Sequence, residues 1–350
     1  MESCITISGR RVGRGNPVYI VAELSANHHQ DFEQAVKLVR AAKEASADAV
    51  KLQAYTPDTL TIDASTEWFR IGRGTPWEGR LLHDLYNEAY MPWEWIPRLK
   101  TLAHDLSLDM FSTAYDVSSV DFLEKLDVPV HKVASYELVD LPLIEKMARS
   151  GKPLIMSTGM ASLGEIEEAI QTARRAGAGQ IALLKCTSAY PAPLEEMNLR
   201  TIPHLAETFN VPVGLSDHSL DVTVPSAAVA LGACIVEKHL TLSRSIKGPD
   251  SDYSLEPQEF KMMVHAIRIT EKVLGEVHYG MTRLEAQSVV FRRSLFVIKD
   301  MRAGEIFTEE NVRSIRPGHG LPPRHLRDVL GRVAAREIAR GTPLSWQLVR

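Results

Sequence analysis

The sequence has few cysteines and no long apolar run. Its three cysteines, Cys4, Cys186 and Cys234, are a small, odd-numbered set that argues against a disulfide framework. The reducing cytosol is the simplest compartment for such a protein, so we expect it to be cytoplasmic. The first residues lack a positive region followed by an apolar core, and no stretch of about 18 apolar residues occurs. We therefore expect neither a secretory leader nor a membrane span.

The sequence also lacks a strong excess of charge of either sign. The formal net charge is -4 and the isoelectric point is about 6.3, which argues against a nucleic-acid partner. A small anionic substrate is compatible with this charge, because a few local cations suffice to bind it. The 350 residues, 45% of them hydrophobic, are enough for one large domain and one small one.

Short β-rich apolar runs alternate with helical patterns over most of the chain. Eight runs are predicted as strands: 18–24, 49–53, 109–115, 130–135, 153–158, 181–187, 212–218 and 234–240. Several are almost continuously apolar, as in buried parallel strands. Eight strand–helix units over about 280 residues predict an α/β fold of the (β/α)8 TIM-barrel type. The alternative is a doubly wound open sheet, but no G-x-G-x-x-G follows the first strand.

The clearest helix follows the fifth predicted strand. Ser162 and Glu165 have the spacing of a capping box at its start. Four apolar residues then fall on one helical face: Ile166, Ala169, Ile170 and Ala173.

One connection is unusually long. More than 50 residues separate the second and third predicted strands, and four of the five tryptophans lie there: Trp68, Trp77, Trp93 and Trp95. One interpretation is an extra helix packed on the barrel. The other is a lid or specificity loop over the barrel mouth.

The end of the chain differs in texture from the rest. It has short strand-like runs such as 294–299, turns such as 302–304 and a Pro/Gly-rich stretch at 316–323. We therefore predict a barrel domain over 1–282 and a separate small β-rich domain over 288–350.

Polar residues follow nearly every predicted strand, at the end where TIM-barrel enzymes place their chemistry. They are Glu23, Lys51, Gln53, Ser112, Thr113, Lys132, Ser135, Glu137, Ser157, Thr158, Lys185, Thr187, Ser188, Tyr190, Ser216, Asp217, His218, Glu237, Lys238 and His239. A lone strand-end histidine is more often structural, and a lone lysine usually reaches solvent. Together, however, these residues would bring several charges to one apolar mouth, which is unfavourable unless an ion and an anionic ligand bind there.

His218 and His239 end the seventh and eighth predicted strands, which are neighbours in a closed barrel. A pair of imidazoles binds a divalent transition metal and leaves positions open for substrate. The first strand has no H-x-H, which makes a two-metal hydrolase less suitable. Lys51 and Lys132 can both point inward beside serine and threonine donors, which suits a ligand with a phosphate and a carboxylate, such as phosphoenolpyruvate.

Six runs in this order resemble the sialic acid synthase family: KVASYE (132–137), STGM (157–160), KCTSAYP (185–191), GLSDH (214–218), EKHLTL (237–242) and GPD (248–250). The C-terminal segment resembles the antifreeze-like (SAF) domain of that family, so the resemblance covers essentially the whole chain. The runs GTPWEG (74–79), DLYNEAY (84–90) and PWEW (92–95) are similar to the pseudaminic acid synthases within it. Ser188 stands where N-acetylneuraminate synthases typically carry asparagine, which puts N-acetylmannosamine in doubt as substrate.

The resemblance implies a condensation of phosphoenolpyruvate with 2,4-diacetamido-2,4,6-trideoxy-altropyranose, with cleavage of the C–O bond of phosphoenolpyruvate. Apolar contacts from the aromatic-rich insert would suit this sugar, which is less polar than N-acetylmannosamine. The resemblance implies a divalent metal on His218 and His239, with Mn2+ expected and Mg2+ or Co2+ as alternatives. Glu23 would orient the metal-bound water or act as a base.

The resemblance also implies two sets of substrate contacts. The residues expected to bind phosphoenolpyruvate are Lys51, Thr113, Lys132, Ser135, Ser188 and Ser216. Those expected to bind the sugar are Gln53, Glu137, Tyr190, Asp250 and Arg316. Arg316 would come from the SAF domain of the partner in a domain-swapped homodimer, whereas without the resemblance it would be interpreted as a surface arginine in a turn.

Three alternatives stay open. The chain could be an N-acetylneuraminate or legionaminic acid synthase of the same family. It could be a different barrel enzyme, such as a metal aldolase or a hydrolase. It could also be a non-catalytic carbohydrate-binding SAF protein, an alternative that loss of the histidine pair or the lysines would have favoured, and all of these are present.

Overall fold

A computed structural model describes residues 4–350 of the chain. Contacts within the chain divide it into a first unit that ends at Gly275 and a second unit, Glu276–Arg350. The predicted domain bounds, 1–282 and 288–350, stay a prediction.

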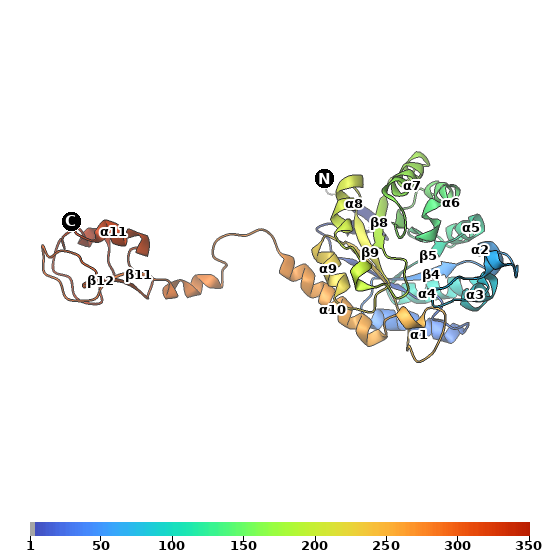
Figure 1. Ribbon diagram of the computed structural model, residues 1–350, viewed down its shortest axis with the longest axis horizontal. Helices are drawn as coiled ribbons and strands as arrows, with labels where there is room; N and C mark the ends of the chain where they lie inside the picture. The colour runs from blue at the N-terminus through green and yellow to red at the C-terminus, as the bar shows by residue number, and fades with distance from the viewer. Residues whose placement is uncertain (1–3) are drawn as a thin grey trace. The chain divides into compact units, whose positions relative to one another are not determined.

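The first unit is a closed barrel of eight parallel strands in the order β10-β3-β4-β5-β6-β7-β8-β9 (Figure 1). The strands are β3 (Tyr19–Glu23), β4 (Ala49–Ala54), β5 (Asp109–Ala114), β6 (His131–Val133), β7 (Leu154–Ser157), β8 (Ile181–Cys186), β9 (Val213–Asp217) and β10 (Ile235–His239). The TIM-barrel prediction is confirmed, and each predicted strand coincides with an observed one to within two residues at either end.

Helices follow the strands and cover the barrel (Figure 1). They are α1 (Phe32–Glu44), α4 (Ile96–Asp105), α5 (Val117–Lys125), α6 (Leu141–Ala148), α7 (Leu163–Arg175), α8 (Thr201–Phe209), α9 (Val224–Ala230) and α10 (Pro257–Leu274). At the start of α7, the side chains of Ser162 and Glu165 each accept a bond from the other residue's backbone N–H, as a capping box requires. The four apolar residues predicted to share one face of this helix are all buried.

A β-hairpin at the start of the chain was not predicted. It pairs β1 (Cys4–Ile7) with β2 (Arg10–Gly13) in antiparallel register. Ile5, Ile7 and Val12 join the barrel core, and the backbone N–H of Thr6 donates to Gln180 Oε1 at 2.5 Å. Because Gln180 directly precedes β8, the hairpin lies at the amino-terminal end of the strands, opposite the end expected to carry the chemistry.

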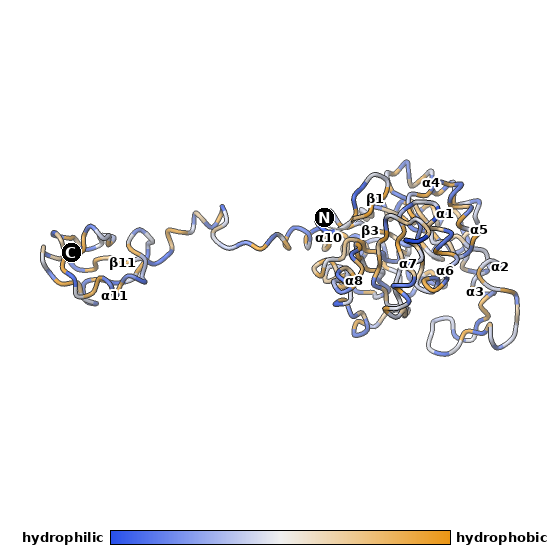
Figure 2. Tube along the Cα trace, turned by 90° about the horizontal axis from the view of Figure 1, so that it is seen from above, coloured by the Kyte–Doolittle hydropathy of each residue, from blue (hydrophilic) through white to orange (hydrophobic). Residues whose placement is uncertain are grey.

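The long connection from β4 to β5 contains α2 (Pro57–Leu60), a 3-10 turn (Glu67–Phe69), α3 (Leu82–Ala89), a second 3-10 turn (Trp93–Trp95) and α4. We call residues 57–95 the insert. Between α2 and α3 the chain forms an exposed loop (Figure 2), closed at its base by a bridge between Arg70 and Leu81.

The second unit has its own small core. Strands β11 (Ser294–Val297) and β12 (Val312–Ile315) pair antiparallel, and isolated bridges such as Met301 with Ile338 extend the β structure. A short helix, α11 (Leu326–Val329), packs beside them, and Leu295, Val297 and Phe307 are among the residues of the core. A small β-rich domain at this end of the chain is therefore observed. In neither unit, over residues 4–350, is a helix both long and apolar enough to cross a bilayer.

Candidate active site

Strand register brings the predicted polar residues together inside the barrel. His239 pairs with Glu23, Gln53 with Thr113, and Thr113 with Lys132 across neighbouring strands. Residues paired in this way point to the same face of a sheet, because side chains alternate along each strand. The five side chains therefore share the interior face, at the carboxyl ends of the strands.

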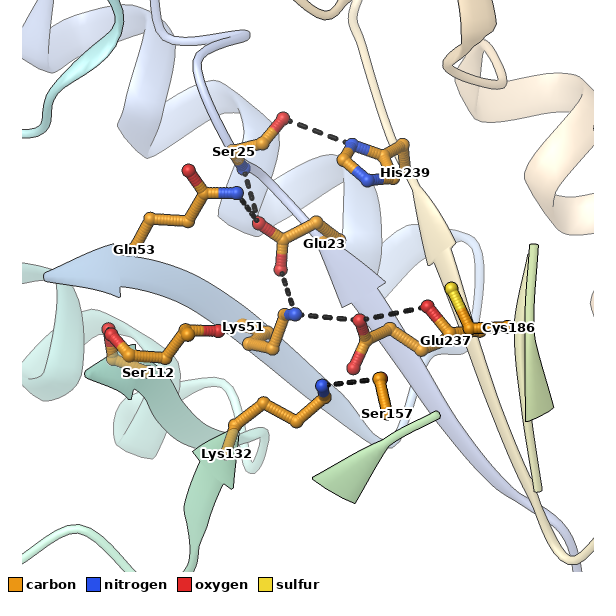
Figure 3. Close-up of polar contacts among 12 residues, drawn as sticks. Glu23, Ser25, Lys51, Gln53, Ser112, Lys132, Ser157, Cys186, Glu237 and His239 are labelled. Carbon is orange, nitrogen blue, oxygen red and sulfur yellow. Dashed lines mark hydrogen bonds and ion pairs between the residues drawn. The ribbon is translucent and has the colours of Figure 1, made fainter. Parts of the chain in front are cut away.

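Lys51 lies between two carboxylates in this interior (Figure 3). Its Nζ donates to Glu237 Oε1 at 2.6 Å and lies 3.2 Å from Glu23 Oε2. Burial by itself lowers the pKa of Lys51, but the two carboxylates outweigh burial and raise that pKa above its usual value. Lys51 is thus a fixed cation, and Ser216 Oγ reaches the same oxygen of Glu237 at 3.4 Å.

Lys132 is the second buried cation. Its Nζ donates to Ser157 Oγ at 2.6 Å and to the carbonyl oxygen of Val133 at 2.8 Å (Figure 3). Unlike Lys51, it has no carboxylate among its hydrogen-bond partners within residues 4–350, and burial lowers its pKa to about 8. A bound anion would favour its charged form.

Two of the predicted site residues have a buried oxygen atom with no hydrogen-bond partner in the described part of the chain: Thr113 Oγ1 and Glu137 Oε2. Burial also raises the pKa of the Glu23 carboxyl, and it raises that of Glu137 to about 7. A buried polar atom without a partner is unfavourable, so these atoms are suited to a ligand that supplies hydrogen bonds.

His218 and His239 face each other with ring centroids 5.3 Å apart. Nδ1 of His218 lies 2.9 Å from the carbonyl oxygen of Thr187, and Nδ1 of His239 lies 3.1 Å from Ser25 Oγ. The contact with a carbonyl oxygen requires a proton on Nδ1 of His218. Burial lowers the pKa of His218, but the neighbouring Cys186 outweighs burial and raises it, so a metal would take the place of the proton on Nε2. Burial lowers the pKa of His239, so this ring is neutral.

The two imidazoles fit a divalent cation. Neutral imidazole nitrogens whose other ring nitrogen is held by a neighbour are typical metal ligands. Within residues 4–350, no group of three or more His, Cys, Asp or Glu side chains is arranged as a metal cluster. A metal here would therefore take two protein nitrogens, with its other positions left to water or substrate.

A cavity of about 410 Å³ opens above these groups. Ten predicted site residues line it: Lys51, Gln53, Lys132, Ser135, Glu137, Tyr190, Ser216, His218, His239 and Asp250. Asp250 is held in place because its carboxylate accepts bonds from the N–H of Ala26, at 3.0 Å, and from the Tyr253 hydroxyl. Tyr190 stacks in a tilted geometry on His218, with centroids 4.5 Å apart.

Ser188 reaches the same site through a tight contact. A Cβ atom on Gly159 would lie 2.2 Å from Ser188 Oγ and 2.8 Å from Ser135 Oγ. Glycine at this position therefore allows both hydroxyls to lie close to its backbone. The N–H of Gly159 donates to Ser135 Oγ at 3.2 Å. Arg316 belongs to the second unit, and its role at the site stays a prediction.

Not all of the polar strand ends converge on the mouth, which corrects the wider expectation. Lys185, Asp217 and Lys238 alternate with the interior residues of β8, β9 and β10 and therefore point outward. Lys238 and Asp217 form a buried ion pair with Nζ 2.5 Å from Oδ2. The sequence pattern alone did not separate the two faces of these strands.

Cys186 and Glu237 are site residues to which the sequence assigned no role. Both line the cavity, and Cys186 Sγ lies 3.9 Å from Nδ1 of His218. Alternation from His239 identifies Glu237, and pairing with Ser216 identifies Cys186. The strand register therefore identifies both residues as part of the site, and this register cannot be derived from a single sequence.

Some tryptophans of the insert pack on the barrel, as in the first interpretation, and one lines the barrel mouth, as in the second. Trp93 stacks on Phe122 with centroids 4.6 Å apart, and Trp95 packs edge-on against Phe32, so both belong to the barrel body. Trp77 lines the cavity, whereas Trp68 is 82% exposed. The insert is thus partly packing and partly a wall of the site.

Comparison with protein families gives two matches. The NeuB family model matches residues 38–279, and the SAF domain model matches residues 292–350. The first match covers most of the barrel unit, and the second covers the small C-terminal unit.

Comparison with individual proteins also finds synthases of nonulosonic acids. The chain is 43% identical to the pseudaminic acid synthase of Helicobacter pylori over 94% of its own length and 97% of that protein. It is 36% identical to the N,N'-diacetyllegionaminic acid synthase of Legionella pneumophila, over 96% and 95%. The crystal structure of N-acetylneuraminic acid synthetase from Leptospira borgpetersenii superposes with a TM-score of 0.74 at 30% identity, covering 83% of this chain and 96% of that one.

Proposed function

Since the chain belongs to the NeuB family and ends in a SAF domain, we propose that it is a pseudaminic acid synthase. It is a transferase that condenses phosphoenolpyruvate with 2,4-diacetamido-2,4,6-trideoxy-altropyranose and water to give pseudaminic acid and inorganic phosphate. The observation that carries this proposal is the interior placement of Lys51 and Lys132 beside the His218–His239 pair, in one cavity. The cavity thus combines two cations for the anionic groups of phosphoenolpyruvate with a metal site for the aldehyde.

Binding of phosphoenolpyruvate at the barrel floor uses groups that are already fixed. The Nζ atoms of Lys51 and Lys132 supply positive charge, and hydroxyls of Ser135, Ser188 and Ser216 supply neutral donors. Thr113 contributes a buried hydroxyl with no partner among the described residues. Because Lys51 already has two carboxylates, Lys132 gains the most from a bound anion.

The sugar lies above phosphoenolpyruvate, with its aldehyde toward the histidines. Gln53, Glu137, Tyr190 and Asp250 line this part of the cavity and are placed to bind and orient the open-chain sugar. The unpaired oxygen of Glu137 is suited to accept a hydroxyl or amide proton of the sugar. Orientation of both substrates over one another is a large part of the rate enhancement for a two-substrate reaction.

The bond changes are those of a condensation with C–O cleavage. The methylene carbon of phosphoenolpyruvate forms a C–C bond with the aldehyde carbon, and the aldehyde oxygen takes up a proton. Water then adds to the carbon that bears phosphate, and phosphate leaves with the C–O electron pair to give the 2-keto acid. Glu23, whose pKa burial raises, would take a proton from the attacking water.

His218 and His239 would hold a divalent cation, for which we propose Mn2+, with Mg2+ or Co2+ as alternatives. When bound, such a cation polarises a carbonyl oxygen and so favours attack on the aldehyde carbon. The neutral state of His239 and the fixed Nδ1 of His218 support this assignment.

The protein is proposed to act in the cytoplasm as a domain-swapped homodimer. All three cysteines are free thiols, which suits a reducing compartment. In the dimer, Arg316 of each chain would contact the sugar in the barrel of the other.

A substrate panel under identical conditions tests the proposal. It compares the altro-configured diacetamido sugar, its manno-configured counterpart and N-acetylmannosamine, with phosphate release from phosphoenolpyruvate as the readout. We expect the altro sugar to give the highest kcat/KM, and no phosphate release without a sugar. Preference for the manno sugar or N-acetylmannosamine would contradict the pseudaminic assignment, and phosphate release without any sugar would contradict the condensation itself.

A further inference from the structure

The insert supplies one wall of the active-site cavity, and this wall is apolar. Eight residues of the insert line the cavity, and the hydroxyls of Thr75 and Tyr86 and the indole N–H of Trp77 are their only polar side-chain groups: Leu60, Ile71, Thr75, Trp77, Leu82, Leu85, Tyr86 and Ala89. None of the described cavity-lining residues between 57 and 95 carries a charge. The charged lining residues come instead from the barrel strands and their loops, so the cavity has a charged floor and an apolar wall.

Trp77 is the best-fixed residue of this wall. Its neighbours Thr75, Pro76 and Glu78 are exposed, whereas Trp77 itself is half-buried. Its indole Nε1 donates to the carbonyl oxygen of Pro249 at 2.9 Å. Trp77 thereby ties the loop of the insert to the segment that carries Asp250, which lies 173 positions further along the chain.

The ring of Trp77 also completes an aromatic cluster beside the metal-site histidines. It lies 5.5 Å from the ring of Tyr190 and 6.5 Å from that of Tyr253, centroid to centroid. Tyr190 in turn lies 4.5 Å from His218. Any sugar whose aldehyde is at the histidines therefore has the apolar wall within reach of its other substituents.

The loop that presents Trp77 is braced by its own backbone. The N–H of Ile71 donates to Arg80 at 2.9 Å, and the N–H of Gly79 donates to Ile71 at 2.9 Å. The N–H of Arg80 donates to the carbonyl of Trp77 itself at 3.1 Å. These bonds hold the backbone that carries the ring, and the bond from Nε1 to Pro249 holds the ring itself.

We propose that Trp77 is a specificity-determining residue, which selects a sugar with apolar substituents at the end away from the aldehyde. This inference rests on the proposed function and assigns its sugar selectivity to the insert. A hydroxyl against the ring of Trp77, whose N–H is already bonded to Pro249, would lose its bonds to water without replacement, whereas a deoxy methyl or an acetamido methyl would not. The apolar wall therefore accepts the diacetamido, deoxy sugar and disfavours N-acetylmannosamine.

Steady-state kinetics of Trp77→Ala test this inference. The selectivity ratio is kcat/KM for the diacetamido sugar divided by kcat/KM for N-acetylmannosamine. We expect this ratio to fall about 10-fold or more, because an extra or missing apolar group in an apolar pocket changes discrimination by about 10–200-fold. The KM for phosphoenolpyruvate should stay within about twofold, since the cations of the barrel floor are untouched. Trp77→Phe keeps an apolar ring but loses the bond to Pro249, and we expect an intermediate fall.

Trp68→Ala is the matched control, because Trp68 lies in the same insert but is 82% exposed. Its selectivity ratio should equal that of the wild type. An unchanged ratio in both Trp77 variants, or an equal fall in Trp68→Ala, would overturn the inference while leaving the proposed function intact. A wild-type enzyme that prefers N-acetylmannosamine would overturn both.

Discussion

At the residue scale, the charged groups of the site differ in how many partners of opposite charge they have. Lys51 has two carboxylate neighbours, whereas Lys132 is held by a serine hydroxyl and a backbone carbonyl. Glu137 is left with an unpaired buried oxygen. A buried polar group without a partner is unfavourable, and the proposed binding of the two substrates would give these groups partners.

The buried carboxyl of Glu137 makes the free energy of unfolding depend on pH. Its folded-state pKa of about 7 lies above that of an unfolded glutamate, so the folded chain binds more protons between the two values. Stability contributed by this group is therefore lost as the pH rises toward 7. Glu137→Gln should be about 2 kcal/mol more stable than wild type at pH 8, and about equal to it near pH 4.5.

Urea unfolding of the full chain at both pH values measures this difference as a shift in the midpoint of the barrel transition. The same variant should have a raised KM for the sugar, because its amide has one acceptor oxygen where the carboxylate has two, and it carries no negative charge. A Gln variant less stable than wild type at pH 8 would contradict the assignment.

Much of the site could be predicted from the sequence, and its omissions share one cause. The histidines and lysines follow strands whose order around a barrel is fixed by sequence order. The ion pair from Lys51 to Glu237 could not be predicted, because it depends on which face of the strand each residue occupies and on the register of strands far apart in sequence. The same limit placed Lys185 and Lys238 with the interior residues, although they point outward.

At the scale of elements, the closed barrel leaves little room between neighbouring strands. A Cβ atom on Gly214 in β9 would lie 2.4 Å from the carbonyl oxygen of Ile235 and 2.8 Å from Leu184 Cδ2. Since the first of these atoms is backbone, it cannot move aside without disturbing β10. Glycine at this position is thus required for strand packing rather than for a turn.

Gly214→Ala should therefore destabilise the barrel by about 1–3 kcal/mol or prevent folding, as overpacked cores do. Gly164→Ala is the matched control, because Gly164 lies in α7 and a Cβ there meets nothing within 4 Å. The control should be about 0.5–1 kcal/mol more stable than wild type, since alanine favours the helix. Thermal unfolding of both variants checks the opposite signs, and equal behaviour would contradict the steric argument.

The strands of the barrel were predicted more completely than the short hairpin and the insert. Short β-rich apolar runs identified all eight barrel strands, and the capping box identified the start of α7. The hairpin of β1 and β2 was missed because two four-residue strands have too short a pattern to distinguish them from a loop. The fate of the insert was also undecided, since its tryptophans serve both packing and the cavity.

At the scale of the whole molecule, the two units carry opposite charge. Residues 276–350 contain 13 basic and 8 acidic residues, whereas the rest of the chain contains 27 basic and 36 acidic residues. Opposite charge favours association of a basic surface with an acidic one. This asymmetry supports the proposed dimer, in which the SAF domain of one chain serves the barrel of another.

Subunit complementation tests the domain swap. We expect His239→Ala to be inactive even with Mn2+ supplied, and Arg316→Ala to have a strongly raised KM for the sugar. Unfolded and refolded together, the two variants form mixed dimers in which one site has both residues intact. Activity should then recover to about a quarter of the wild-type value, as random pairing in a twofold dimer predicts.

Each variant refolded alone is the control and should show no such recovery. A mixture no more active than the average of its two components would contradict the swapped arrangement. Substantial turnover by His239→Ala alone would contradict the metal assignment instead.

The position of the insert has a practical consequence for engineering. Residues 57–95 enter shortly after β4 and leave directly into α4, while the cations and histidines of the floor all lie outside them. The proposed apolar wall and the cations proposed to bind phosphoenolpyruvate are thus encoded in separate stretches of the gene. Grafting this one stretch from a relative is therefore a compact way to retarget such an enzyme to other nonulosonic acids while its bond-forming centre is kept.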